Sequence, residues 1–413
     1  MNAVIVTIGD ELLIGQVVNT NAAFIAGRLS DAGVRILRIV TVGDHKMDID
    51  RGLREAFTEA DVVIMTGGLG PTHDDVTKRA VADFFSLPLV HDPALKGRIA
   101  SLLGSRGIAW NDAAQEQTMV PSGAAILPNR YGTAGGILIE RTGKMVLALP
   151  GVPYEMEQII TDSVVPLLSA KLTGTIAVHR TLRTAGITES ALAARLNVPA
   201  SLPPGVTLAF LPSLSGVRLR LDATGPSRDD AGRSITAAEA LIRERGGRYV
   251  YGAENDELED VVGTMLSASG RTLSCAESCT GGAIAKKLTS VPGSSSYFLG
   301  SVVAYDNRLK VQLLGVAPSL LATHGAVSRE TSLAMASGVR LVTGSDIGIS
   351  VTGIAGPSGG SPEKPVGTVW IACADSEGSV ALKHTFGEGR ERVVERAAVA
   401  ALDLLRRRLL RLE

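Results

Sequence analysis

A serine, a lysine and two glycines in the C-terminal third of the chain are suited to nucleophilic catalysis. Ser278 lies in the segment Ala276-Glu-Ser-Cys-Thr-Gly-Gly282, between an expected strand and an expected helix, and Lys310 follows it along the chain. The N–H groups at a helix start that opens with glycines suit an anion or an oxyanion. This motif contains no histidine, but a desolvated lysine near a serine can take its proton, as in Ser-Lys acyl-transfer enzymes.

Simpler explanations fit each of these residues taken alone. A Ser-x-x-Gly at a helix start is usually an N-cap, and a single lysine is most often solvated. Cys275 and Cys279 have no neighbouring His or Cys at metal-ligand spacing and are expected to be small buried side chains. A glycine-rich loop, residues 353–360, follows another buried strand, and its backbone can approach a phosphate or a sugar closely. The residue pattern alone supports a hydrolase hypothesis and no more.

A second group of polar residues follows buried strands near the start of the chain. The segment 67–75 reads Gly-Gly-Leu-Gly-Pro-Thr-His-Asp-Asp and comes directly after the apolar run Val62–Thr66. Its glycines permit a close approach to a phosphate, and Asp74 and Asp75 offer the oxygen ligands that Mg²⁺ carried on a pyrophosphate prefers. The alternative is a helix N-terminus that favours acidic residues because of its dipole. The further candidate ligands near these strand ends are Glu11, Asp44 and Thr72.

The elements that must position these residues alternate between strands and helices in the first part of the chain. Apolar runs predict strands, and apolar residues at helical spacing predict helices, at 3–8, 21–30, 34–42, 49–60, 62–66, 145–149 and 154–168. This alternation predicts a doubly wound parallel sheet, in which ligands bind at the carboxyl ends of the strands.

The middle of the chain has a different pattern, with elements in the order βαββαβ, which predicts a small α+β domain. It has no convincing polar cluster, and we interpret it as a spacer or a dimerisation element. Beyond a polar boundary at 252–257 the alternation of strands and helices resumes and ends in a helix over 392–410. We therefore predict three domains, at 1–172, 173–253 and 254–413, the last with an α/β fold.

Composition argues against several classes of protein. The 413 residues carry a formal net charge of −1, which provides no long-range attraction to nucleic acid or to anionic membranes. Three cysteines do not make a disulfide framework and indicate a reducing compartment. No apolar run approaches the ~20 residues that a membrane helix needs, and the first residues do not resemble a signal peptide. We expect a cytoplasmic protein.

Six motifs occur in order in the C-terminal part: Glu277-Ser-Cys-Thr-Gly-Gly, Val291-Pro-Gly-Ser-Ser, Tyr305-Asp-Asn-x-x-Lys310, His324-Gly-Ala-Val-Ser328, Thr352-Gly-Ile-Ala-Gly-Pro-x-Gly-Gly and Lys364-Pro-Val-Gly-Thr-Val369. Together they resemble the nicotinamide mononucleotide (NMN) deamidase domain of the CinA (competence/damage-inducible protein A) family. The resemblance implies hydrolysis of the NMN carboxamide to the acid and ammonia, without a metal or another cofactor.

The resemblance also implies a role for each residue. Ser278 attacks the carboxamide carbon, Lys310 acts as base and then as acid towards the leaving ammonia, and Tyr305 relays or orients the proton transfer. Backbone N–H groups hold the oxyanion, and one such donor is typically worth ~10²–10³ in rate. The implied oxyanion donors lie at Thr280, Gly281 and Gly282. The remaining candidate substrate contacts are Gly353, Gly356 and, for the phosphate, Arg390.

The front of the chain resembles another part of the same family. Its motifs are Gly9-Asp-Glu-Leu-Leu-Ile-Gly-Gln-x-x-Asn-Thr-Asn21, Thr41-Val-Gly-Asp44, the segment 67–75, Leu127-Pro-Asn, Gly132-Thr-Ala and Leu149-Pro-Gly-Val-Pro-x-Glu-Met156. They are similar to the MoaB/Mog-like molybdopterin-binding fold of CinA proteins, and 182–252 fits the family's KH-type domain. The resemblance implies hydrolysis of the ADP-ribose pyrophosphate with K⁺ and a divalent metal such as Mg²⁺. The implied metal ligands are Asp74, Asp75, Asp44 and Glu11, and the implied substrate contacts are Gly67, Gly68, Gly70 and Thr72.

Two departures from the family pattern and two rival hypotheses remain. Asp306 stands where the family often has serine, and Gly135 stands where it commonly has proline, which predicts a looser loop. In the first rival, the front domain binds a pterin or a nucleotide without turnover. In the second, the protein is an adaptor in DNA uptake, which predicts a basic face and a Gly-x-x-Gly loop that the middle segment lacks. We expect small nucleotides (NMN and ADP-ribose) as partners, rather than nucleic acid or membrane, and a homodimer.

Overall fold

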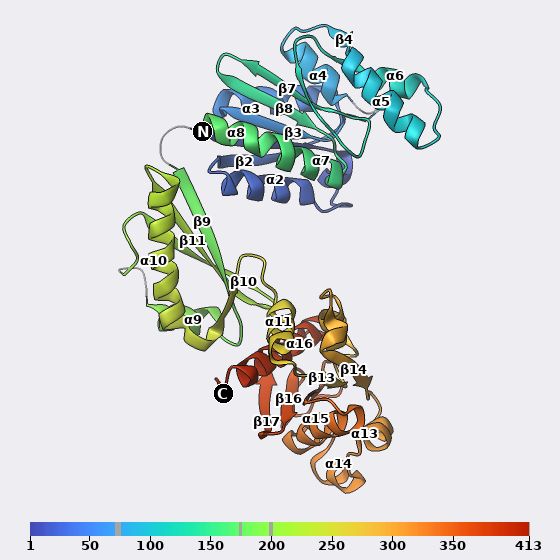
Figure 1. Cartoon of the computed structure of the whole chain (residues 1–413), viewed down its shortest axis with the longest axis vertical. Coiled ribbons are helices and arrows are strands. Elements are labelled where there is room, and N and C mark those ends of the chain that lie inside the picture. Colours follow the sequence, from blue (N-terminus) through green and yellow to red (C-terminus); the bar gives the residue numbers. More distant parts are fainter. Residues whose placement is uncertain (71–75, 173–175, 198–200, 413) are drawn as a thin grey trace. The chain divides into compact units, whose positions relative to one another are not determined.

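Figure 1 shows a computed structural model of the chain, which describes residues 1–70, 76–172, 176–197 and 201–412. The chain divides into two compact units. The first comprises Met1–Val178 with Ala223–Arg233, and the second comprises His179–Asp222 with Ser234–Glu413. Within the described residues, no helix combines the length and the apolar character needed to cross a membrane.

The first unit is built on a six-stranded sheet with the strand order β2-β1-β3-β8-β7-β6. The first four strands in this order are parallel, as predicted, and the last two continue the sheet in antiparallel fashion. Their bounds, in the order of the sheet, are Arg35–Val42, Asn2–Ile8, Val62–Thr66, Lys144–Leu149, Gly136–Arg141 and Ala125–Leu127. The central strand β3 is buried at every position, because helices cover both of its faces.

Alternate residues of the central strands pack into two separate cores. Ile64 of β3 joins the cluster under α2 (Thr20–Asp31) and α7 (Pro153–Ile159). Val63 and Met65 join the cluster under α3 (Lys46–Glu59) and α4 (Thr77–Phe84). A π-helical turn, Ile160–Val164, joins α7 to α8 (Val165–Lys171). The sequence pattern predicted no elements in the stretch that forms β4 (Leu89–His91), α5 (Pro93–Ser105), α6 (Asp112–Gln117) and β5 (Met119–Pro121).

The middle of the chain confirms the predicted order βαββαβ. Its elements are β9 (Ile176–Thr184), α9 (Glu189–Leu196), β10 (Val206–Ser213), β11 (Gly216–Gly225), α10 (Arg228–Gly246) and β12 (Val250–Ala253). A short 3₁₀ turn, Gly247–Tyr249, precedes β12, and the strands form one sheet in the order β10-β11-β9-β12. Within the second unit this part contacts the C-terminal part, because the guanidinium of Arg406 donates to the carbonyl oxygen of Arg248 and Ala185 joins the C-terminal core.

The C-terminal part has a five-stranded sheet with the order β14-β13-β15-β16-β17. The first three strands are parallel and the last two antiparallel. Their bounds are Phe298–Val303, Leu273–Glu277, Ile347–Gly353, Thr368–Asp375 and Gly378–Thr385. One face packs against α11 (Leu258–Ser269), α12 (Ala283–Thr289) and α16 (Arg390–Leu409). The other face packs against α15 (Arg329–Thr343), with α13 (Asn307–Leu314) and α14 (Pro318–His324) beside it.

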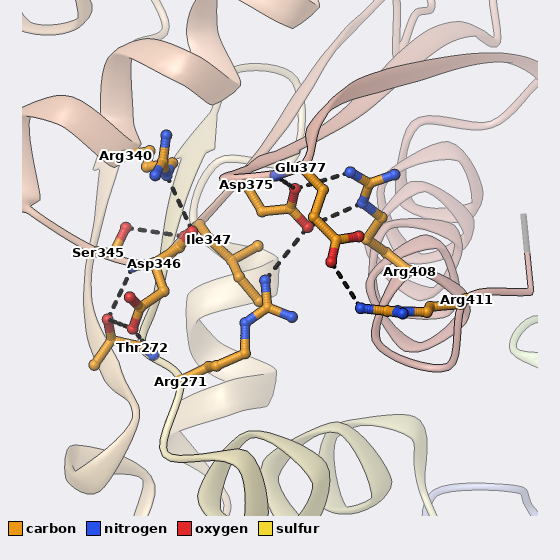
Figure 2. A network of polar contacts seen from close by, with 10 residues as sticks. All are labelled: Arg271, Thr272, Arg340, Ser345, Asp346, Ile347, Asp375, Glu377, Arg408 and Arg411. Carbon is orange, nitrogen blue, oxygen red and sulfur yellow. Dashed lines mark hydrogen bonds and ion pairs between the residues drawn. The ribbon is translucent and has the colours of Figure 1, made fainter.

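Figure 2 shows a polar network that fastens the end of α16 to this sheet. The buried carboxylate of Asp375, at the end of β16, accepts hydrogen bonds from the guanidinium of Arg408 at 2.8 and 2.9 Å and from that of Arg271 at 3.3 Å. Glu377 adds a backbone N–H at 2.8 Å and an ion pair with Arg411. The hydrogen bond from Arg408, more than any other contact, lowers the pKa of Asp375 to about 2.

Candidate active sites

The pocket of the C-terminal part lies at the carboxyl ends of β13 and β15, where parallel sheets bind their ligands. It has a volume of about 320 Å³. The sequence placed its main candidate residues far apart along the chain, and the fold brings them to this one pocket. Its lining includes Ser278, Cys279, Tyr305, Asn307, Lys310, Gly353, Gly356 and Arg390.

A tight turn between β13 and α12 fixes the position of Ser278. The backbone N–H of Ser278 donates to the carbonyl oxygen of Val351 at 3.0 Å, which continues the pairing of β13 with β15. Its carbonyl oxygen accepts from the N–H of Gly281 at 3.2 Å. Gly281 and Gly282 have φ angles of 60° and 102°, which side chains disfavour. The glycines therefore let the chain turn at once from strand to helix, and the serine remains at the pocket wall.

Lys310 approaches Ser278 from α13 and is only 1% exposed. Its Nζ atom lies 3.1 Å from the Oγ atom of Ser278, 2.7 Å from the carbonyl oxygen of Ala304 and 3.2 Å from that of Tyr305. No carboxylate within the described residues forms an ion pair with this amine. Burial lowers the pKa of Lys310, although the carboxylate of Asp306 acts in the opposite direction. An amine in these surroundings can lose its charge and then accept the hydroxyl proton of the serine.

The N–H groups at the start of α12 are not free, in contrast to the expectation from the two glycines. The N–H of Gly281 donates to Ser278, and that of Gly282 donates to the carboxylate of Glu277 at 2.9 Å. In the part of the chain that the structure describes, Cys279 and Thr280 are the residues of this turn whose N–H groups donate to neither a backbone nor a side-chain oxygen. Of the three expected oxyanion donors, the geometry therefore keeps Thr280, excludes Gly281 and Gly282, and adds Cys279 as a candidate.

Arg390 and Tyr305 meet at the mouth of the pocket. The Nη2 atom of Arg390 donates to the hydroxyl oxygen of Tyr305 at 2.9 Å, and its Nη1 atom donates to the carbonyl oxygen of Gly356 at 3.0 Å. No carboxylate of the described chain forms an ion pair with Arg390, so its charge is available to an anion. Tyr305 is 59% exposed, and its hydroxyl is bonded to Arg390 rather than to Ser278 or Lys310. This arrangement suits an orienting role for Tyr305 more than a proton relay.

The pocket of the first unit is larger, about 490 Å³, and lies at the carboxyl ends of β1, β3 and β8. It is lined by Gly67, Gly68 and Gly70, by hydroxyl and amide side chains, and by the carboxylates of Glu11, Asp44 and Glu155. No lysine, arginine or histidine is part of its described lining. A phosphorylated ligand here therefore meets backbone N–H groups and carboxylates, and the carboxylates favour a cation between them and the phosphate.

Part of the predicted metal site lies beyond the described residues. Thr72, Asp74 and Asp75 are among residues 71–75, which the structure does not describe. Glu11 follows β1 in the short helix α1 (Asp10–Leu13), and Asp44 follows β2. Asp44 accepts from the N–H of Asp10 at 3.0 Å, and Asp10 accepts in turn from the N–H of Asp44 at 3.3 Å. Within the described residues, no three His, Cys, Asp or Glu side chains form a group that could hold a metal ion.

Three residues that shape this pocket were not among the predicted site residues. Glu155 is buried and accepts from the side-chain amide of Asn129 at 2.6 Å. Arg98 donates to the carbonyl oxygens of residues 129, 132 and 133. These bonds hold the loop around Gly135, which the glycine was expected to loosen, and Asn129 also donates to the carbonyl oxygen of Ala134 at 2.8 Å. The motifs Leu127-Pro-Asn and Leu149-Pro-Gly-Val-Pro-x-Glu contained a signal for Asn129 and Glu155, whereas nothing in the sequence marked Arg98.

Comparisons with known proteins cover nearly the whole chain. Residues 4–170 match the family model described as "Probable molybdopterin binding domain", residues 179–252 match "Damage-inducible protein CinA KH domain", and residues 255–409 match "CinA C-terminal domain". A CinA-like protein of Salinibacter ruber is 47% identical over 411 residues, which cover 99% of this chain and 100% of that protein. A CinA-like protein of Gemmatimonas aurantiaca is 46% identical over 413 residues, which cover 98% of this chain and 96% of that protein. A crystal structure of a competence/damage inducible protein from Agrobacterium tumefaciens, 41% identical, covers 36% of this chain and 91% of its own, with a TM-score of 0.35.

Proposed function

This chain belongs to the CinA family, and we propose that its C-terminal domain is an amidohydrolase that converts NMN to nicotinate mononucleotide and ammonia. The observation that supports this most is the 3.1 Å contact between the Lys310 amine and the Ser278 hydroxyl, because a buried lysine with neutral partners is a competent base. The family resemblance suggests the substrate class, and the geometry of the Ser278–Lys310 pair supports the proposed reaction type.

The proposed reaction has two halves. In the first, the neutral amine of Lys310 takes the Oγ proton of Ser278 while Oγ bonds to the carboxamide carbon. The oxyanion that forms accepts hydrogen bonds from the N–H groups of Cys279 and Thr280. The ammonium of Lys310 then protonates the departing nitrogen, the C–N bond breaks, and an ester on Ser278 remains. In the second half, Lys310 takes a proton from water as the water oxygen attacks the ester carbon, and then returns that proton to Ser278 Oγ.

Arg390 is the proposed ligand of the NMN phosphate. Its guanidinium is held at the pocket mouth by Tyr305 and by the carbonyl oxygen of Gly356, and a planar guanidinium suits the geometry of a phosphate. The glycine loop that includes Gly353 and Gly356 offers a backbone that a ribose or a phosphate can approach. The reacting amide then lies at the inner end of the pocket, beside Ser278.

Ammonia release from NMN by the purified full chain tests the proposal. We expect turnover that persists in EDTA and falls to the background rate in Ser278→Ala, with an unchanged melting temperature as evidence that the variant folds. The absence of ammonia release from well-folded wild-type protein would refute the proposed substrate. A deamidase that EDTA inhibits would contradict the metal-independent mechanism.

A second proposed activity, the hydrolysis of the ADP-ribose pyrophosphate, belongs to the first unit. The carboxylate-lined pocket at the strand ends favours it. Glu11 and Asp44, with Asp74 and Asp75, fit a hard divalent cation, because all four offer oxygen ligands. When bound, such an ion supplies charge neutralisation for the pyrophosphate and for attack by water at phosphorus, and K⁺ is expected in addition. Glycines 67, 68 and 70 let the backbone approach the phosphates.

Substitution of one proposed ligand separates the two activities. We expect Asp75→Ala to lose metal-dependent ADP-ribose hydrolysis while NMN deamidation survives, because the two sites lie in different units and share no residue. Full ADP-ribose turnover in Asp75→Ala would make this carboxylate structural. A wild type that binds nucleotides or pterins without turnover would make the first unit a binding module.

A further inference from the structure

The carboxylate of Glu277, directly before Ser278, is fully buried, and the proposed reaction gives it no role. Hydrogen bonds nevertheless compensate for the loss of its hydration. Its two oxygens accept from the backbone N–H groups of Gly282 at 2.9 Å, Ala285 at 3.0 Å and Ile284 at 3.2 Å, and from the hydroxyl of Ser301 at 3.1 Å. A charge removed from water is tolerated when hydrogen bonds and a helix dipole replace its hydration.

This carboxylate replaces an N-cap that the sequence of α12 does not supply. At α13 and α15 the N-cap residues, Asp306 and Ser328, use their own side chains to accept from the first turn. At α12 the N-cap is Gly282, which has no side chain to do so. Glu277, at the end of β13, accepts from the first turn of α12 in place of an N-cap side chain. Its contacts therefore bridge the whole turn that contains Ser278.

The backbone of the same residue supports the other catalytic partner. The carbonyl oxygen of Glu277 accepts from the N–H of Ala304 at 2.8 Å, and the carbonyl oxygen of Ala304 accepts from the Lys310 amine at 2.7 Å. The side chain also reaches β14 through Ser301. Glu277 thus contacts both the segment that carries Ser278 and the segment that holds Lys310.

We infer that Glu277 is a positioning residue for the Ser278–Lys310 pair, in which its side chain fixes the turn around the serine. The inference rests on the proposed amidohydrolase reaction. Because the carboxylate also occupies the N–H groups at the start of α12, it leaves the N–H groups of Cys279 and Thr280 for the oxyanion. A loose turn would increase the distance between Ser278 Oγ and Lys310 Nζ and would at the same time displace the N–H groups of Cys279 and Thr280.

Glu277→Gln is the test, because it keeps the volume and replaces one acceptor oxygen by an NH₂ group that faces a backbone N–H. A misplacement on the order of 1 Å can cost about 10²-fold in rate, so we expect kcat to fall by about 10²-fold. KM for NMN should remain within roughly threefold of the wild-type value, since Arg390 and the glycine loop are unchanged. The pH-rate profile should keep its position, because Lys310 still titrates. Glu277→Asp, which keeps the charge, should recover part of kcat.

Asp375→Asn is the matched control for instability. It also removes a buried, hydrogen-bonded carboxylate, in the network of Figure 2 at the end of β16, and Asp375 does not line the pocket. We expect it to lower the melting temperature while kcat per folded molecule stays at the wild-type value. An equal fall of kcat in both variants, or wild-type kcat in Glu277→Gln, would overturn the positioning role. Loss of one limb of the pH profile in Glu277→Gln would instead make Glu277 an acid or base and overturn it as well.

Labelling of Ser278 by a fluorophosphonate, measured by mass spectrometry, separates failure of this inference from failure of the proposed substrate. We expect wild-type protein to be labelled at Ser278 about 10²-fold faster than Glu277→Gln. If the wild type is labelled but releases no ammonia from NMN, NMN is refuted as the substrate. Slow labelling of Glu277→Gln in that case would still support the positioning role of Glu277. Equal labelling rates would overturn the role, and a wild type that neither labels nor releases ammonia would overturn both proposals.

Discussion

Replacement of Lys310 by methionine is expected to abolish deamidation and to change how stability depends on pH. Methionine is also a long, unbranched side chain, but it carries no titratable group. Lys310 is 1% exposed and its three hydrogen-bond partners are neutral oxygens, so the folded state disfavours its charge and the pKa of Lys310 is lowered from 10.5. The unfolded chain has no such environment.

The sign and the upper limit of the effect follow from proton linkage. Between the lowered pKa of folded Lys310 and 10.5, the unfolded chain binds more protons at this position than the folded chain does. The free energy of unfolding of the wild type therefore rises with pH in this interval, by at most about 1.36 kcal/mol per pH unit for one group. This contribution is complete above 10.5 and is lost as pH falls through the folded pKa. In Lys310→Met it is absent.

Urea denaturation of the two proteins at pH 7, 8, 9 and 10 measures this difference. The other titrating groups, including Asp306 and Cys279 near the amine, are common to both proteins, and most of their effect cancels. We expect the stability of the wild type relative to Lys310→Met to increase with pH, and kcat/KM of the wild type to rise through the same ionisation. Parallel stability curves would refute the reasoning, because a lysine with an ordinary pKa is charged at neutral pH and is a poor base for Ser278.

Three further predictions concern the surroundings of the same site. Asp306→Ser should move the pH-rate profile to lower pH, because the carboxylate raises the pKa of Lys310. Since the Asp306 side chain is 53% exposed, screening by solvent should keep the shift below about one pH unit. A shift to higher pH would contradict the assignment of Lys310 as base. Arg390→Ala should raise KM for NMN and leave KM for the dephosphorylated nucleoside unchanged. Equal effects on both KM values would contradict the proposed contact between Arg390 and the phosphate. Asp375→Asn should lower the free energy of unfolding by about 2 kcal/mol at pH 7, because the pKa of Asp375 is lowered from 3.8 to about 2 and each unit is worth about 1.36 kcal/mol. Acid titration of the wild type should show this contribution to stability above pH 4 and its loss as pH falls towards 2. If the variant loses stability over the same pH range, another group is responsible for the acid dependence.

Local patterns predicted the parts of the fold that depend on local burial. Val62–Thr66 is a strand over the predicted residues because a strand covered on both faces must be apolar throughout. The antiparallel strand β7 was not predicted, since the direction in which a strand joins a sheet depends on the path of the whole chain. The segment that forms α5 and α6 was also not predicted to contain helices. Its helix α5 buries only Leu95, Ile99 and Leu103, a narrow apolar stripe that gives a weak periodic signal.

The candidate site was predicted to the extent that it depends on side chains with a distinctive motif. Ser278 and Lys310 are 32 residues apart and come within 3.1 Å, as the family motifs implied. The role of Tyr305 could not be settled from the sequence, because its hydroxyl is bonded to Arg390, which is 85 residues away along the chain. Contacts of this kind depend on which loops the sheet brings to one edge, and no local spacing encodes them.

The start of α12 shows why a glycine-rich helix start is not in itself an anion site. The glycines permit the turn, and the same absence of side chains leaves the first N–H groups without a cap. Those groups must find an acceptor when they are buried, and in this chain Glu277 provides it. A phosphate at this position would have to displace a buried carboxylate and would meet its charge. We therefore expect the anionic end of the proposed substrate at Arg390, whose guanidinium has no carboxylate partner among the described residues.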